Sequence, residues 1–92
     1  MYYVYILYSK KLDKRYIGFT KNLIERRKQH NQKETTFTKT GAPWQLIYYE
    51  VFRSKKDAME EEKFLKSGKG RERISFLLKD TLQNIRIGSS TG

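Results

Sequence analysis

An arginine and a histidine in this sequence have the types and the spacing that phosphate chemistry requires. Arg26 and His30 lie four residues apart in a segment predicted to be helical, so they share one face of the helix, one turn apart. A guanidinium group binds phosphate through two parallel hydrogen bonds and stays charged. An imidazole can transfer a proton or hold a phosphate oxygen. Arg26 is therefore a candidate phosphate clamp, with Arg27 as its competitor, and His30 is a candidate proton-transfer group.

Two tyrosines and a run of glutamates can act with that pair. Tyr5 and Tyr16 fall in two short segments predicted to be adjacent strands, so their hydroxyls can converge on one water or phosphate. A tyrosine with its usual pKa of about 10 is a poor base at neutral pH, but a nearby cation favours the phenolate. In the predicted helix over 55–66, Glu61 and Glu62 lie on either side of the apolar line through Ala58 and Leu65. Helical periodicity therefore does not decide which of the two faces the site. The alternative is that these glutamates form a solvated acidic face.

The composition points to a polyanionic partner and excludes several kinds of site. The chain has 92 residues, with 20 Lys and Arg against 10 Asp and Glu, a net charge of +10 that attracts nucleic acid. The basic excess lies at both ends, around a slightly acidic middle over 34–62. The absence of cysteine excludes disulfides and thiolate sites, and a single histidine excludes a His-rich zinc site. No apolar run approaches a membrane span and the N-terminus does not resemble a signal peptide, so we expect a cytoplasmic protein.

The elements that must position these side chains follow from hydrophobic patterns and breakers. Runs rich in β-branched and aromatic residues predict three strands, over 2–8, 16–19 and 44–52. Helical patterns predict three helices, over 22–31, 55–66 and 71–80. Thr20 or Asn22 can cap the first helix and Ser54 the second, which Gly68 and Gly70 are expected to end.

This order, β-β-α-β-α-α, predicts an α+β fold with a three-stranded antiparallel sheet flanked by helices. The first two strands form a hairpin because their link is short. Gly18 inside a strand indicates a close approach of another group. We expect one domain over 1–80 and a flexible C-terminal tail over 81–92.

Two tripeptides in the predicted hairpin carry a resemblance to a known family. Val4-Tyr5-Ile6 and Tyr16-Ile17-Gly18 resemble the paired signature of the GIY-YIG nuclease superfamily, with VYI in place of the first tripeptide. Residues 22–31 resemble the family's first helix, and residues 54–66 resemble the helix that bears its metal-binding glutamate. The resemblance covers residues 1–80. It is closest to small standalone bacterial members, which are related to the nuclease domain of a DNA-repair excinuclease.

The resemblance implies a divalent-metal-dependent endonuclease that hydrolyses phosphodiester bonds in DNA. The catalytic residues that it implies are Tyr5, Tyr16, Arg26, His30 and Glu62. Glu62 is preferred to Glu61 because the family glutamate stands four residues after the helix alanine. It is the implied ligand of a single Mg²⁺ or Mn²⁺ ion, and Mg²⁺ suits one carboxylate because it keeps much of its hydration shell. Weaker contacts to nucleic acid are expected from Lys39, Trp44 and Lys66.

The expected partner is DNA, with RNA as the alternative, and no membrane. We expect no recognition domain after residue 80, which favours structure-directed cutting in DNA repair or processing over sequence-specific cutting. The alternative function is a non-catalytic nucleic-acid-binding module on the same scaffold. The nuclease is favoured because an inward carboxylate at Glu62 would repel phosphate unless a cation bridged the two.

Overall fold

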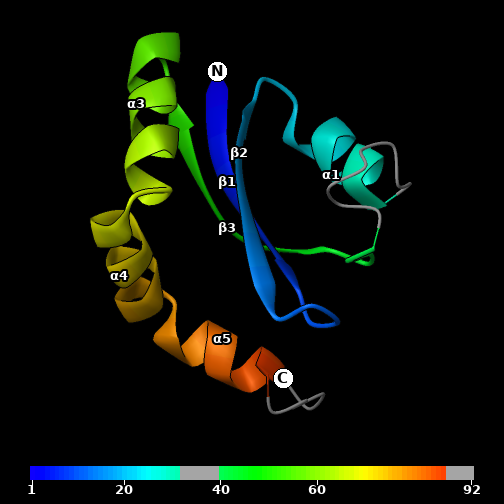
Figure 1. Cartoon of the computed structure of the whole chain (residues 1–92). Coiled ribbons are helices and arrows are strands. Elements are labelled where there is room, and N and C mark those ends of the chain that lie inside the picture. Colours follow the sequence, from blue (N-terminus) through cyan, green and yellow to red (C-terminus); the bar gives the residue numbers. More distant parts are fainter. Residues whose placement is uncertain (32–39, 87–92) are drawn as a thin grey trace.

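A three-stranded antiparallel sheet forms the centre of the computed structural model, which describes residues 1–31 and 40–86. The strands, in the spatial order β2-β1-β3, are β1 (Tyr2–Ser9), β2 (Lys14–Thr20) and β3 (Gln45–Phe52). The helices are α1 (Leu23–Asn31), α3 (Lys55–Leu65), α4 (Gly68–Leu77) and α5 (Lys79–Arg86). Helices α3, α4 and α5 follow one another along one side of the sheet, and α1 lies on the other side (Figure 1). The predicted α+β fold with an antiparallel sheet is confirmed.

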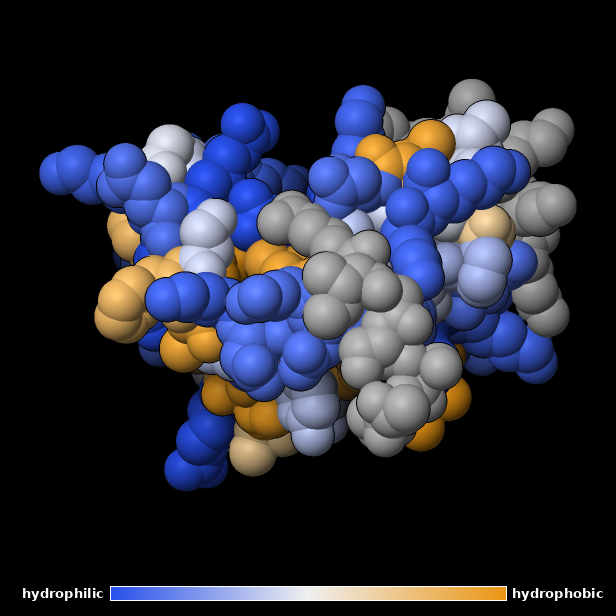
Figure 2. Space-filling model, turned by 90° about the horizontal axis from the view of Figure 1, so that it is seen from below, coloured by the Kyte–Doolittle hydropathy of each residue, from blue (hydrophilic) through white to orange (hydrophobic). Residues whose placement is uncertain are grey.

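The central strand β1 is buried on both faces, as its unbroken apolar run predicts. Successive side chains of a strand point to opposite faces. Val4, Ile6 and Tyr8 accordingly pack in one core cluster with residues of α3, α4 and α5. Tyr5 and Leu7 pack in a second cluster on the α1 side. Hydrophilic side chains dominate the described surface when the molecule is seen from below, with smaller apolar patches between them (Figure 2).

Two helices begin at the predicted caps. Asn22 Oδ1 accepts a hydrogen bond from the Glu25 amide at 3.0 Å, at the start of α1. Ser54 Oγ accepts one from the Asp57 amide at 3.2 Å, at the start of α3. Each cap satisfies an amide that has no partner within the helix. None of the described helices is both long enough and apolar enough to cross a membrane.

The C-terminal third differs from the prediction. Gly68 and Gly70 lie in the first turn of α4, where Ser67 is the cap, so they do not end α3 as predicted. A Cβ atom on Gly70 would lie 2.5 Å from Cα of Leu65 and still closer to the carbonyl oxygen of Phe64. The glycine therefore lets the start of α4 pack directly on the end of α3.

The last predicted helix, over 71–80, is divided between two helices, because α4 ends at its C-cap Leu78 and α5 begins at Lys79. The predicted tail over 81–92 therefore begins too early. Residues 81–86 belong to α5, where Leu82 is buried and Ile85 packs against the same core.

Candidate active site

The side chain of Tyr5 lies over strand β2, opposite Gly18. Tyr5 in β1 is the cross-strand partner of Gly18 in β2. A Cβ atom on Gly18 would lie 2.5 Å from Cζ of Tyr5 and still closer to its hydroxyl oxygen. Since β2 is an edge strand, the missing side chain lets the Tyr5 hydroxyl extend from the centre of the sheet towards its edge. The close approach predicted at Gly18 is confirmed.

Three other predicted site residues, from three different elements, act on this hydroxyl. Burial raises the pKa of the Tyr5 hydroxyl above its ordinary value, and neighbouring charges then act on it. Tyr16 and Glu62 raise this pKa further, while Arg26 lowers it. Because the effect of a charge on a pKa declines with distance, Tyr5 and these three residues lie near one another and form one group. We call Tyr5, Tyr16, Arg26 and Glu62 the Tyr5 cluster.

The raised pKa decides the state of the Tyr5 hydroxyl. The sequence suggested that a nearby cation would favour the phenolate, but the effect of Arg26 is outweighed by burial and by the other two neighbours. Tyr5 is therefore a neutral phenol at neutral pH, which donates a hydrogen bond and does not accept a proton.

Tyr16 is held by aromatic neighbours on both sides. Its ring centroid lies 6.3 Å from that of Tyr5 and 6.3 Å from that of Trp44, which meets it edge-on at 67°. Trp44, which the sequence predicted as a nucleic-acid contact, is only 2% exposed, and its ring is part of the core that supports Tyr16. Asn31 anchors that core, because its side chain accepts from the Trp44 amide at 2.6 Å and donates to the Trp44 carbonyl at 3.3 Å.

Helix α1 turns Arg26, and not Arg27, towards the cluster. Arg26 is half-buried and acts on the Tyr5 hydroxyl. Arg27 is exposed and lines a separate hollow beside Ile24. The backbone of His30 continues α1 one turn after Arg26, but its side chain lies outside the described part of the structure. Lys39 also lies outside the described residues.

Helix α3 separates the two glutamates that periodicity could not separate. Glu62 acts on Tyr5, whereas Glu61 shares a hydrogen bond with Glu50 of β3. This hydrogen bond, burial and the Glu50 charge raise the pKa of Glu61 to about 7, opposed by Arg73. Glu61 therefore faces a second carboxyl group, away from the Tyr5 cluster.

The Glu62 carboxylate already has a cation as its neighbour. Lys66 Nζ lies 3.0 Å from Glu62 Oε2, and the Glu62 side chain keeps a quarter of its surface exposed. A hard, oxygen-only donor beside phenol hydroxyls fits Mg²⁺ or Mn²⁺. Among the described residues no group of three or more acidic, histidine or cysteine side chains could hold a metal ion. A divalent ion at Glu62 would therefore keep most of its water, as Mg²⁺ commonly does.

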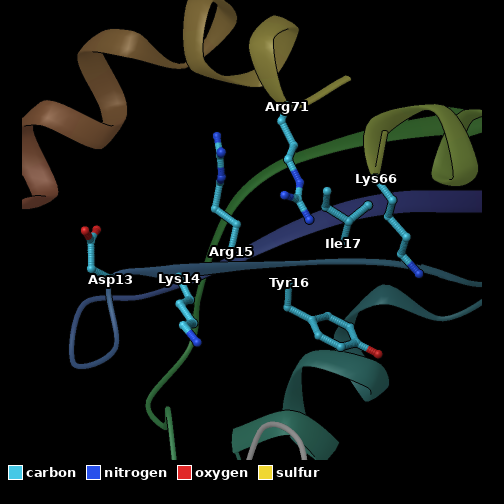
Figure 3. A pocket seen from close by; sticks show the side chains of 7 residues that line it. All are labelled: Asp13, Lys14, Arg15, Tyr16, Ile17, Lys66 and Arg71. Atoms are coloured by element: carbon cyan, nitrogen blue, oxygen red, sulfur yellow. The ribbon is translucent and has the colours of Figure 1, made fainter. Parts of the chain in front are cut away.

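A groove of about 630 Å³ runs along the outer edge of β2, beside the cluster. It is lined by Asp13, Lys14, Arg15, Tyr16, Ile17, Lys66 and Arg71. In Figure 3 the hydroxyl of Tyr16 and the ammonium group of Lys66 lie towards the same end of it, and Arg71 reaches down from α4 towards Ile17. We call it the β2-edge groove. Through Tyr16 it is continuous with the Tyr5 cluster.

Comparisons with known proteins show which family the chain resembles. A UPF0213 protein of Pediococcus pentosaceus is 39% identical over 74 residues, which cover 77% of this chain and 78% of that protein. A UPF0213 protein of Staphylococcus haemolyticus is 35% identical over 77 residues, or 83% of this chain and 93% of that protein. No solved structure matches significantly. The GIY-YIG catalytic domain matches residues 1–75, and the chain therefore belongs to the GIY-YIG family, a family of nucleases.

Proposed function

We propose that this protein is a divalent-metal-dependent endonuclease that hydrolyses DNA phosphodiester bonds, in structure-directed repair or processing of DNA. One observation supports the proposal: charged or titratable side chains from β2, α1 and α3 act on the hydroxyl of Tyr5 in β1. The group combines a guanidinium, two phenols and one carboxylate. A polyanion-binding surface alone does not need that carboxylate.

Hydrolysis requires a water to attack phosphorus, a proton to leave that water, and the bond to the leaving oxygen to break. Arg26 would hold two phosphate oxygens through its planar fork and offset their charge. The neutral Tyr5 hydroxyl would donate a hydrogen bond that positions the phosphate or the water. We assign proton removal to Tyr16, which borders the open groove, with His30 in its predicted supporting role.

Glu62 would hold the divalent ion, which when bound supplies positive charge and Lewis acidity at the phosphate. Before the ion binds, the ion pair with Lys66 would balance the negative charge of the Glu62 carboxylate. With its carboxylate engaged in holding the ion, Glu62 would no longer pair with the Lys66 ammonium group. Lys66 would then be available to pair with a phosphate oxygen in the β2-edge groove.

The decisive experiment compares cleavage of plasmid and branched DNA by the wild type, Glu62→Ala and Glu60→Ala, with Mg²⁺ or Mn²⁺ present and binding measured in parallel. Glu62→Ala should abolish cleavage and retain binding. Glu60→Ala, an exposed position on the same helix, should behave as the wild type. Equal cleavage by all three proteins would contradict the metal assignment. Binding by the wild type without cleavage under any metal would favour a non-catalytic binding module.

Two adjacent arginines give a second test on one helix. A single charged hydrogen bond contributes about 1.5–3 kcal/mol, so Arg26→Ala, which removes two such bonds, should slow cleavage by at least roughly 10- to 150-fold. Arg27→Ala removes the same charge from a side chain that faces another hollow, and should change the rate far less. The opposite ranking would show that α1 presents its other face to the substrate.

A further inference from the structure

Basic side chains from three parts of the chain converge on the β2-edge groove. Lys14 and Arg15 belong to β2, Lys66 directly follows α3, and Arg71 belongs to α4. Asp13 is the one acidic side chain in the lining. The groove is thus strongly positive, although its lining residues are separated by up to 58 positions in the sequence.

The cations stand on both sides of the strand edge. Lys14 precedes Tyr16 by two residues, so it points to the same face of the sheet about 7 Å further along β2. Arg15 points to the opposite face, where its Nη1 lies 3.4 Å from the Ser75 hydroxyl of α4. Arg71 reaches into the groove from the same helix (Figure 3). A strand of phosphates lying along β2 would therefore meet positive charge on either side.

Charged residues on an edge strand have another common purpose, which is to prevent a second sheet from pairing with it. That purpose explains Lys14 and Arg15 on β2, but it does not explain Lys66 and Arg71, which come from the helix side. In the part of the chain that the structure describes, no carboxylate lies within ion-pair distance of Lys14 or Arg71. Positive charges that lie near one another, such as those of Lys14 and Arg71 in this lining, repel, and a bound polyanion relieves that repulsion.

We propose that the β2-edge groove binds the sugar–phosphate backbone of the substrate strand next to its scissile phosphate, without reading its sequence. The inference rests on the proposed function for the position of that phosphate, at the Tyr5 cluster. The lining is dominated by cations, which pair with phosphates, and it has no amide side chain of the kind that reads adenine. Its arginines are also of the kind that reads guanine, so the test below compares two DNA sequences. Contacts to phosphates position a nucleic acid and carry no sequence information.

The experiment measures binding without cleavage. Fluorescence anisotropy of labelled single strands, two unrelated DNA sequences and the RNA version of one, is recorded in EDTA over a series of salt concentrations. The chains compared are the wild type, Lys14→Gln, Arg71→Gln and the control Lys56→Gln. Lys56 lines a different hollow on the outer side of α3, beside Met59, so it removes one charge away from the groove.

In each groove variant, log K should fall less steeply with log salt, with the magnitude of the slope smaller by about 0.7. This is the value for one phosphate contact on a single strand. This corresponds to a loss of about fivefold in affinity at 0.1 M salt. The control should keep the wild-type slope, and both DNA sequences should respond alike. Comparison of the DNA and RNA probes identifies which backbone the groove prefers. Thermal unfolding of each variant shows that the effect is not a loss of folding.

Equal slopes for groove and control variants would overturn the inference, as would a loss confined to one of the two DNA sequences. Its failure is distinguishable from failure of the nuclease proposal. If the wild type cleaves DNA and the groove variants bind normally, the groove inference is rejected and the nuclease proposal stands. If the wild type cleaves no substrate but the groove variants bind more weakly, the nuclease proposal is rejected and the groove remains a backbone-binding site.

Discussion

Substitution of Gly18 by alanine should displace the hydroxyl at the centre of the proposed active site. The added methyl group would lie 2.5 Å from Cζ of Tyr5, whereas ordinary contacts begin near 3.4 Å, so the end of the ring must move by about 0.9 Å. Tyr5 is 1% exposed and its ring contacts Tyr16, so the displacement disturbs the cluster and is not absorbed in solvent. A misplacement of about 1 Å can cost 100-fold in rate, or about 2.7 kcal/mol.

The same methyl group overfills the core around Tyr5. Overpacking of this kind costs about 1–3 kcal/mol, and each kcal/mol lowers the Tm of a domain this size by about 4–8 °C. The assay therefore combines cleavage rates with thermal unfolding. Gly68→Ala is the matched control, because a Cβ atom at Gly68 meets nothing within 4 Å, and it should leave both quantities close to the wild type.

A second variant separates loss of geometry from loss of folding. Gly18→Ala combined with Tyr5→Phe removes the oxygen that lies closest to the new methyl group, so it should recover part of the lost stability but none of the activity. A Gly18→Ala protein with wild-type cleavage rate and wild-type Tm would refute the reasoning, because it would mean that the Tyr5 ring does not lie over β2.

Two further predictions test the carboxyl pair and the buried tryptophan. Because the pKa of Glu61 is about 7 in the folded chain against an ordinary 4.5, the folded state holds this proton more tightly than the unfolded chain. Its stabilising effect is complete below pH 4.5 and is lost as pH rises through 7. Between about pH 4.5 and 8, the free energy of unfolding of the wild type should fall by about 1 kcal/mol more than that of Glu61→Gln, a value reduced for solvent screening. Denaturation measurements that show the same pH dependence for the two proteins would contradict this. Trp44, the single tryptophan, should resist fluorescence quenching by iodide despite the basic surface that attracts the anion, and strong quenching would show that it is not in the core.

Local features of the fold could be read from the chain because their causes are local. The strand over 2–8 follows from an unbroken β-branched and aromatic run, and the caps at Asn22 and Ser54 follow from side chains that bond to an amide three residues away. The division of the C-terminal region into α4 and α5 could not be read in this way. Leu78 and Leu82, on either side of the division, are both buried in the core that β1 and α3 also line, and this packing is not visible in the sequence.

The residue types of the candidate site were determined by the sequence, through two tripeptides and helix positions that resemble the GIY-YIG signature. Tertiary structure decided which member of each ambiguous pair faces the site. Arg26 and Arg27, or Glu61 and Glu62, differ by about 100° around their helices, and only packing against the sheet sets which direction is inward.

The β2-edge groove belongs wholly to tertiary structure. Lys14, Lys66 and Arg71 do not stand out in a chain with 20 basic residues, and no spacing along the sequence connects them. They meet because α3 and α4 pack beside β2, at the point where Gly18 lets Tyr5 extend over the strand. The sequence therefore determined a basic protein with the groups for phosphate chemistry, and the packing of helices on one sheet edge decided where those groups and that charge come together.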